Sequence, residues 1–182
     1  MASLAWWVMT APPNPEPAPT RPRGPNRLPA LGSRGGGWVA LQVVLFAAAG
    51  AAGLLGGGWP ERARPWLWLA GGAAGVGGVA LALLGGAGLG SQLTPFPRPV
   101  AAGELRQDGV YGLVRHPIYG GVLLILLGWS LLTSPAALVT FALAIVFFEA
   151  KRRREEAWLL DAHPDYADYR ARVPRRFLPY LW

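Results

Sequence analysis

The sequence contains no cysteine. This excludes disulfide bonds, thiolate metal ligands and a cysteine nucleophile, and we expect no metal site. Charged residues are also scarce, at 15% of the 182 residues, whereas 52% are hydrophobic. Because a soluble domain of this size would need more polar surface, the composition favours an integral membrane protein.

The charge that is present is mostly positive, with 17 Lys and Arg against 10 Asp and Glu. Nucleic-acid binding is the usual alternative for so basic a chain. Here the basic residues lie between apolar stretches rather than along one soluble face. We therefore expect no nucleic-acid partner.

The first 37 residues differ from the rest of the chain in composition. Eight prolines lie between residues 11 and 29. Such a density of proline favours an extended, unpacked segment. The pattern predicts a disordered, proline-rich cytosolic leader over residues 1–37.

Four apolar stretches follow. Residues 38–58 and 66–90 carry no charge, and the first is long enough, at 1.5 Å per residue, to reach about 30 Å across a bilayer. The second has small residues four apart, which either form a helix-packing seam or reflect the general abundance of glycine. Shorter stretches at 117–133 and 135–148 predict a helical hairpin.

The basic residues also predict the orientation. Residues 1–37, 91–116 and 149–182 together hold 15 of the 17 Lys and Arg. By the positive-inside rule both termini are then cytoplasmic, and we expect a bacterial plasma membrane. The predicted fold class is all-α: an integral membrane bundle of about four transmembrane helices with a cytosolic C-terminal helical cap. Residues 38–90 form the first two helices, and residues 91–182 form the core that carries the site.

The fourth apolar stretch has no internal glycine or proline before residue 162, so it predicts one helix of about 27 residues, near 40 Å long, that emerges into water. On it Glu149, Arg153 and Glu156 share a face, and Arg152 pairs with Glu156 at i+4. The basic run 151–154 predicts an anchor that contacts the headgroups of anionic membrane lipids.

The polar segment Arg115-His116 runs directly into Pro117. Proline fits the first turn of a helix, so the third stretch begins there and leaves His116 at its N-terminal cap. Ionisable groups at the mouth of a membrane helix tend to face a cavity or a ligand.

These residues resemble a known family. The shared segments, in chain order, are Gly109-Val110-Tyr111, Arg115-His116-Pro117-Ile118-Tyr119-Gly120, Glu155-Glu156, Tyr166-Ala167-Asp168-Tyr169 and Val173-Pro174-Arg175. Over residues 95–179 the chain resembles the isoprenylcysteine carboxyl methyltransferases and is similar to the related phospholipid N-methyltransferases. The resemblance implies an S-adenosyl-L-methionine-dependent methyltransferase that takes a lipophilic small molecule from the bilayer.

The resemblance also implies the site. The residues expected to bind the cofactor are Gly109, Tyr111, Arg115, His116, Pro117, Tyr119, Gly120, Glu155 and Glu156. Arg115, His116 and Glu156 are expected to be catalytic. Their chemistry suits the ligand, because carboxylates bind ribose or ammonium groups, cations and helix N-termini bind its carboxylate, and aromatic faces bind a sulfonium. Which of Glu155 and Glu156 contacts the cofactor stays open, as do the oligomeric state and the methyl acceptor: carboxylate, amine, quinol or polyprenyl.

Two other functions are compatible with the sequence. Membrane sterol reductases have a similar Arg-His-Pro-x-Tyr segment and use NADPH, although they usually have more spans. A non-enzymatic membrane scaffold is the third possibility.

Overall fold

The computed structural model describes residues 28–98 and 103–181, so most of the predicted leader, residues 1–27, lies outside the described residues. The described part is helical and contains no strand. This confirms the all-α prediction. The helices are α2 (Gly36–Leu55), α3 (Arg64–Leu89), α4 (Pro117–Thr133), α5 (Ala137–Ala162) and α6 (Tyr166–Arg172), with short 3-10 helices η1 (Gly90–Gln92) and η2 (Gly109–Gly112).

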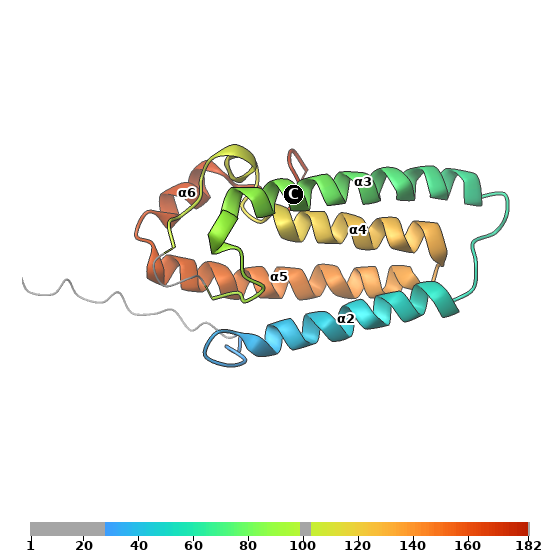
Figure 1. The fold of residues 1–182 in the computed structure, drawn as a ribbon, viewed down its shortest axis with the longest axis horizontal. Helices are drawn as coiled ribbons and strands as arrows, with labels where there is room; N and C mark the ends of the chain where they lie inside the picture. Colours follow the sequence, from blue (N-terminus) through green and yellow to red (C-terminus); the bar gives the residue numbers. More distant parts are fainter. Residues whose placement is uncertain (1–27, 99–102, 182) are drawn as a thin grey trace, which may run out of the picture.

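The four long helices run along one axis of the molecule (Figure 1). The start of α2, the end of α3, the start of α4 and the end of α5 lie at the same end of the bundle, where α6 also lies. The described residues of the segments that the charge pattern places on one side of the membrane therefore lie toward one end of the molecule. That this end is cytoplasmic stays a prediction.

Proline and glycine mark the helix ends. Pro65 and Pro117 occupy the first turns of α3 and α4, where the missing N–H costs no helical hydrogen bond. Gly90 follows α3 with a φ of 53°, a conformation that glycine adopts more readily than other residues.

Two helical segments, Gly36–Leu55 and Arg64–Gln92, are long and apolar enough to cross a membrane, and Pro117–Thr133 is a shorter apolar helix. Their outward side chains are strongly exposed, for example Val44 at 66% and Val76 at 73%. Exposed apolar faces of this kind suit contact with lipid. The structure thus agrees with a membrane bundle, and the count of four spans stays a prediction.

The contact between α3 and α4 is a seam of glycines. Gly71 and Gly78 of α3 face Gly128 and Gly121 of α4, and a Cβ built on Gly78 would lie 2.6 Å from the carbonyl oxygen of Gly121. Small residues allow this approach, which supplies van der Waals contact where lipid offers no hydrophobic driving force. Gly71 and Gly78 each belong to one of the pairs spaced four apart, but the seam itself repeats every seven residues, and a Cβ on Gly75 would have no neighbouring atom within 4 Å.

Helix α5 is continuous from its apolar first half into its charged second half, as the lack of glycine and proline predicts. Phe148, at the change from one to the other, is fully buried against Leu123 and Leu126 of α4 and Phe177 of the C-terminal segment. This cluster packs α5 against α4 at the point where the charged half of α5 begins.

Candidate functional site

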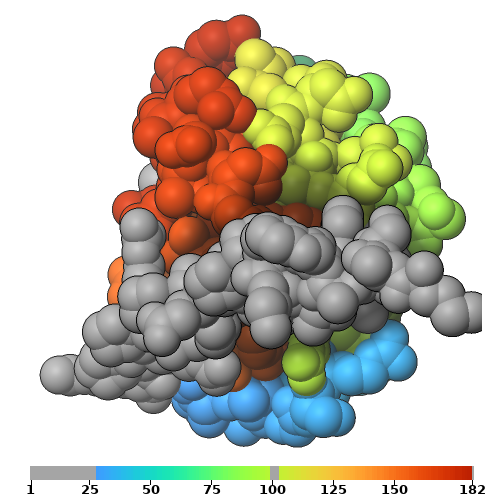
Figure 2. Space-filling model, turned by 90° about the vertical axis from the view of Figure 1, so that its left-hand side faces the viewer, coloured from blue at the N-terminus to red at the C-terminus, as the bar shows by residue number. Residues whose placement is uncertain are grey.

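The site lies where the loop before α4, the second half of α5 and the C-terminal segment meet. Figure 2 views this end, where the C-terminal part and the segment before α4 lie next to one another. Gln107 joins the two, because its side chain donates to Asp165 at 3.0 Å and accepts from Arg172. Three segments distant in sequence thus converge on one end of the bundle.

The Arg115-His116 segment is held by the C-terminal tail. The N–H of Arg115 donates to the carbonyl of Arg175 at 3.1 Å, and the N–H of His116 donates to that of Arg176 at 2.8 Å. One turn later, a Cβ on Gly120 would lie 1.9 Å from the carbonyl oxygen of Phe177. Glycine is therefore required at 120 for the tail to lie against α4.

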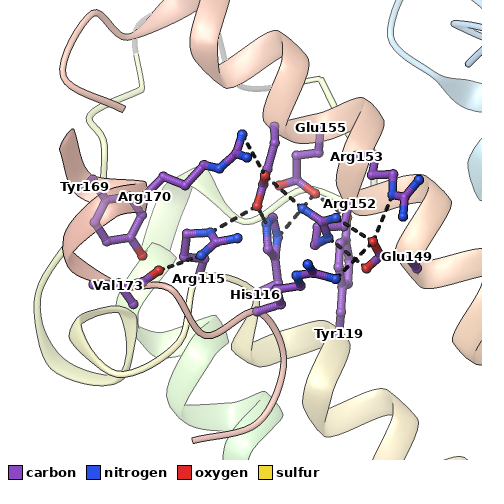
Figure 3. A network of polar contacts seen from close by, with 12 residues as sticks. Arg115, His116, Tyr119, Glu149, Arg152, Arg153, Glu155, Tyr169, Arg170 and Val173 are labelled. Carbon is purple, nitrogen blue, oxygen red and sulfur yellow. Dashed lines mark hydrogen bonds and ion pairs between the residues drawn. The ribbon is translucent and has the colours of Figure 1, made fainter. Parts of the chain in front are cut away.

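Glu156 is the centre of a buried ion-pair network (Figure 3). Its carboxylate lies 3.0 Å from Arg115 Nε, 3.1 Å from His116 Nε2 and 2.8 Å from Arg152 Nη1. It is only 3% exposed. Burial by itself would raise the pKa of Glu156, but the hydrogen bond and charge of His116 and the charges of Arg152 and Arg115 outweigh burial and lower that pKa far below its ordinary value.

A second carboxylate, Glu149, continues this network along α5. It accepts from Arg152 at 2.6 Å and from Arg153 at 2.9 Å, and Arg176 of the tail lies 3.3 Å away. Arg152 therefore bridges Glu149 and Glu156. The network joins the tail, α5 and the start of α4 into one unit.

Glu155 points elsewhere. It accepts a hydrogen bond of 2.5 Å from the hydroxyl of Tyr119, and its carboxylate lies 3.8 Å from His116 Nδ1. The rings of His116 and Tyr119 stack at 5.5 Å. Glu155, His116 and Tyr119 thus form one polar wall, which Figure 3 shows beside the Glu156 network.

This wall borders a cavity of about 430 Å³. Five of the residues predicted to bind the cofactor line it: Tyr111, Arg115, His116, Tyr119 and Glu155. The other four, Gly109, Pro117, Gly120 and Glu156, are not among its lining residues. Of the two glutamates that the sequence left undecided, Glu155 faces the cavity and Glu156 faces the ion-pair network.

Three further tyrosines, Tyr111, Tyr166 and Tyr169, line the cavity. Tyr169 donates to the carbonyl of Tyr111 at 2.8 Å, and Tyr111 donates to the carbonyl of Gly85 at 3.2 Å. Burial raises the pKa of all three phenols, Tyr111, Tyr166 and Tyr169, so they stay neutral donors at physiological pH.

Tyr166 differs from the other two. It is 1% exposed, and its hydroxyl has no hydrogen-bond partner within the described residues. Leaving a buried hydroxyl unpaired costs about 1–3 kcal/mol. An occupant of the cavity with a polar group at this point would remove that cost.

Gln42 and Lys151 are among the polar residues of the cavity that the sequence predictions missed. Gln42 is the only side-chain amide in the otherwise apolar helix α2, and a polar group at membrane depth is the signal that points to it. The basic run 151–154 was assigned to lipid headgroups. The structure instead buries Lys151 and Arg152 at 2% and 6% exposure, because both turn toward the bundle interior.

The chain spans only part of the curated relatives it matches. It is 40% identical over 73 residues to the cobalt-zinc-cadmium resistance protein CzcN of Cupriavidus metallidurans, which covers 38% of this chain and 33% of that protein. It is 33% identical over 89 residues to the Delta(14)-sterol reductase TM7SF2 of Mus musculus, which covers 46% of this chain and 21% of that protein. No solved structure matches the chain significantly.

A family model for phospholipid methyltransferases matches residues 67–165. The match runs from the first turn of α3 through the whole of α5 and ends just before α6, so it includes both the Arg115-His116 segment and the Glu155-Glu156 pair. It covers more than half of the chain. The narrower resemblance to isoprenylcysteine carboxyl methyltransferases stays a prediction. Because this family model covers more than half of the chain, including the segments around the cavity, the chain belongs to the phospholipid methyltransferase family.

Proposed function

We propose that this protein is an integral membrane methyltransferase that uses S-adenosyl-L-methionine and methylates a lipophilic small molecule. The observation that carries the proposal is the cavity of about 430 Å³, lined by the family motif on one side and by apolar side chains on another. Its volume lies in the range of small-molecule sites, about 300–1,000 Å³. Family membership supplies the reaction class.

The donor set of the cavity fits this cofactor. Glu155 supplies a carboxylate for ribose hydroxyls or an ammonium group, and Arg115 and His116 supply donors for a carboxylate. Tyr166 supplies an unpaired hydroxyl, and the ring of Tyr119 supplies an aromatic face that favours a cation. When bound, the cofactor provides an electrophilic methyl group on a sulfonium.

The residues of this chain contribute positioning. The tail and the Glu156 network hold Arg115 and His116 in place, and Val122, Phe148 and Leu159 provide an apolar wall for the acceptor. Alignment of two reactants in a closed site contributes up to about 7–11 kcal/mol in favourable cases. Glu156 therefore acts as a positioning residue in this proposal, through Arg115 and His116.

Binding of S-adenosylhomocysteine to the purified protein in detergent tests the proposal. We expect this product of the cofactor to raise the melting temperature, by an amount that grows with the logarithm of its concentration once that concentration exceeds Kd. NADPH is the matched control, because the similarity to a sterol reductase makes a reductase the second candidate. A shift with NADPH alone would favour the reductase, and no shift with either ligand would favour the scaffold.

The acceptor is identified by incubating the protein with methyl-labelled S-adenosyl-L-methionine and a total membrane-lipid extract. We expect label in a lipid-soluble product. Label that remains entirely in the aqueous phase would contradict the lipophilic acceptor.

Tyr166→Phe tests the role of the unpaired hydroxyl. Because this hydroxyl has no partner in the described residues, its removal should leave the melting temperature of the free protein unchanged or slightly higher. Loss of one hydrogen bond should weaken S-adenosylhomocysteine binding about 3- to 10-fold, measured by calorimetry. Tyr169→Phe is the matched control, because it removes the bond to the Tyr111 carbonyl and should lower stability instead. Unchanged affinity in Tyr166→Phe would remove this hydroxyl from the site.

A further inference from the structure

Lys151 is the only lysine of the chain, and it is buried at the wall of the cavity. Its Nζ donates to Gln42 Oε1 at 2.6 Å and to the carbonyl oxygen of Pro95 at 3.2 Å. It also lies 5.3 Å from the centre of the Tyr119 ring. The ammonium group is therefore held in a defined position, beside the polar wall of Glu155, His116 and Tyr119.

All of these partners are neutral. Lys151 forms no ion pair with any carboxylate in residues 28–98 and 103–181, where an ion pair means an N–O distance of 4.0 Å or less. Glu155 acts on it only through its longer-range charge, because the carboxylate of Glu155 is bonded to Tyr119. The neighbouring Arg152, by contrast, has two carboxylates. A buried cation without a counter-ion is costly. A negatively charged group placed next to Lys151 would therefore be stabilising.

The surroundings of Lys151 connect the cavity to the membrane helices. Gln42 lies in α2, a helix apolar enough to cross a membrane, and Phe148 and Val122 line the cavity on the same side as apolar groups. Polar groups inside such helices mark ligand paths more often than structural contacts. An occupant that approaches from the apolar side would bring its polar end to Lys151.

We propose that Lys151, oriented by Gln42 and the Pro95 carbonyl, binds an anionic group, a carboxylate or a phosphate, on the lipophilic acceptor. That this ligand is the methyl acceptor rests on the proposed function. The binding of an anionic group at Lys151 does not depend on that function. The same charge disfavours a lipid whose only charged group is a cationic amine. Lys151 is thus a specificity-determining residue of the site.

The ionisation state of Lys151 is directly measurable, because a single lysine gives a single set of side-chain signals. Burial lowers the pKa of Lys151, and the charge of Glu155 opposes that effect. An anion bound at Nζ should raise the pKa and shift the signals of the side chain. Full-length protein labelled with ¹³C,¹⁵N-lysine in detergent is the sample for this measurement.

The experiment titrates four probes that have the same type of hydrocarbon tail and differ in the head group: oleate, oleyl phosphate, oleyl alcohol and oleylamine. We expect at least one anion to bind about tenfold or more tighter than the alcohol and to shift the lysine signals, and oleylamine to bind most weakly. The two anionic arms distinguish a carboxylate from a phosphate ligand. Equal binding of the anions and the alcohol, or tightest binding of oleylamine, would overturn the proposal.

Variants separate the charge of Lys151 from its packing. Lys151→Gln should abolish the preference for the anion, whereas Lys151→Arg should retain most of it. Gln42→Glu places the missing carboxylate beside Nζ, so it should also abolish the preference while keeping or raising the melting temperature. This second route keeps the test valid if Lys151→Gln does not fold. Arg154→Gln removes a charge three residues further along α5, at a residue outside the cavity lining, and should leave the anion preference unchanged.

S-adenosylhomocysteine binding separates this proposal from the proposed function. Anion preference that depends on Lys151, without any binding of S-adenosylhomocysteine, would support the anion site and contradict the methyltransferase. Binding of S-adenosylhomocysteine with no anion preference would support the methyltransferase and contradict the anion site. If Lys151 were instead a general base, Lys151→Arg would lose turnover while all variants kept equal affinity for oleate and oleyl alcohol.

Discussion

Glu156→Ala is expected to lower the free energy of unfolding by about 3–5 kcal/mol, because the substitution leaves Arg115 buried without its counter-ion and leaves Arg152 with Glu149 alone. Arg115 itself is only 7% exposed, so water cannot replace the lost carboxylate. The measurement is thermal or denaturant unfolding in detergent. Binding of S-adenosylhomocysteine should also be lost, since Arg115 and His116 lose the group that positions them.

Glu155→Ala is the matched control for this change, since it removes the adjacent carboxylate. Glu155 is more exposed and is bonded mainly to Tyr119, so its loss should cost clearly less stability. It should still weaken S-adenosylhomocysteine binding, because Glu155 lines the cavity. Equal stability losses in the two variants would contradict the assignment of Glu156 as the centre of the network.

The same network predicts how stability depends on pH. Because folding lowers the pKa of Glu156, its contribution is fully present above the ordinary carboxyl value of 4.5 and is lost progressively as the pH falls below it. The melting temperature of the wild type should therefore fall on acidification below about pH 4.5. Glu156→Gln cannot titrate at this position, so its curve should be flatter. Parallel curves would show that other carboxylates cause the acid sensitivity.

Gly78→Leu is expected to destabilise the bundle by about 3 kcal/mol or more, at the upper end of overpacking effects. The Cβ of residue 78 would lie 2.6 Å from the Gly121 carbonyl oxygen and 2.8 Å from the Ile125 nitrogen. Both are backbone atoms of α4, so α3 and α4 would have to separate. Because α4 carries the Arg115-His116 segment at its start, binding of S-adenosylhomocysteine should weaken as well.

Gly77→Leu makes the same chemical change one residue earlier on α3. A Cβ at residue 77 has no neighbouring atom within 4 Å, and replacing glycine in a helix gains about 0.8–1.0 kcal/mol of helix propensity. We therefore expect this variant to be as stable as the wild type or more so. If both leucine variants lost similar stability, the α3–α4 seam would not be the cause.

Local sequence determined the helices. Pro117 marked the start of α4, and the absence of glycine and proline marked the continuity of α5, because helix ends depend on residues within one turn. The pairing of Arg152 with Glu156 was also predictable, since residues four apart meet on a helix. The motif residues Arg115 and His116 could be found by their place at the mouth of an apolar stretch.

Only the tertiary structure decided which residues face the cavity. Adjacent side chains on a helix point about 100° apart, so nothing local distinguishes Glu155, which lines the cavity, from Glu156, which is buried in the ion-pair network. In the sequence Lys151 is one more residue of a basic run, and only the structure shows that it donates a hydrogen bond to Gln42, 109 positions earlier. The charge pattern and the helix periodicity predict only contacts between residues that lie within a few helical turns of one another. The contacts that build the site join segments far apart in the chain, and only their packing brings them together.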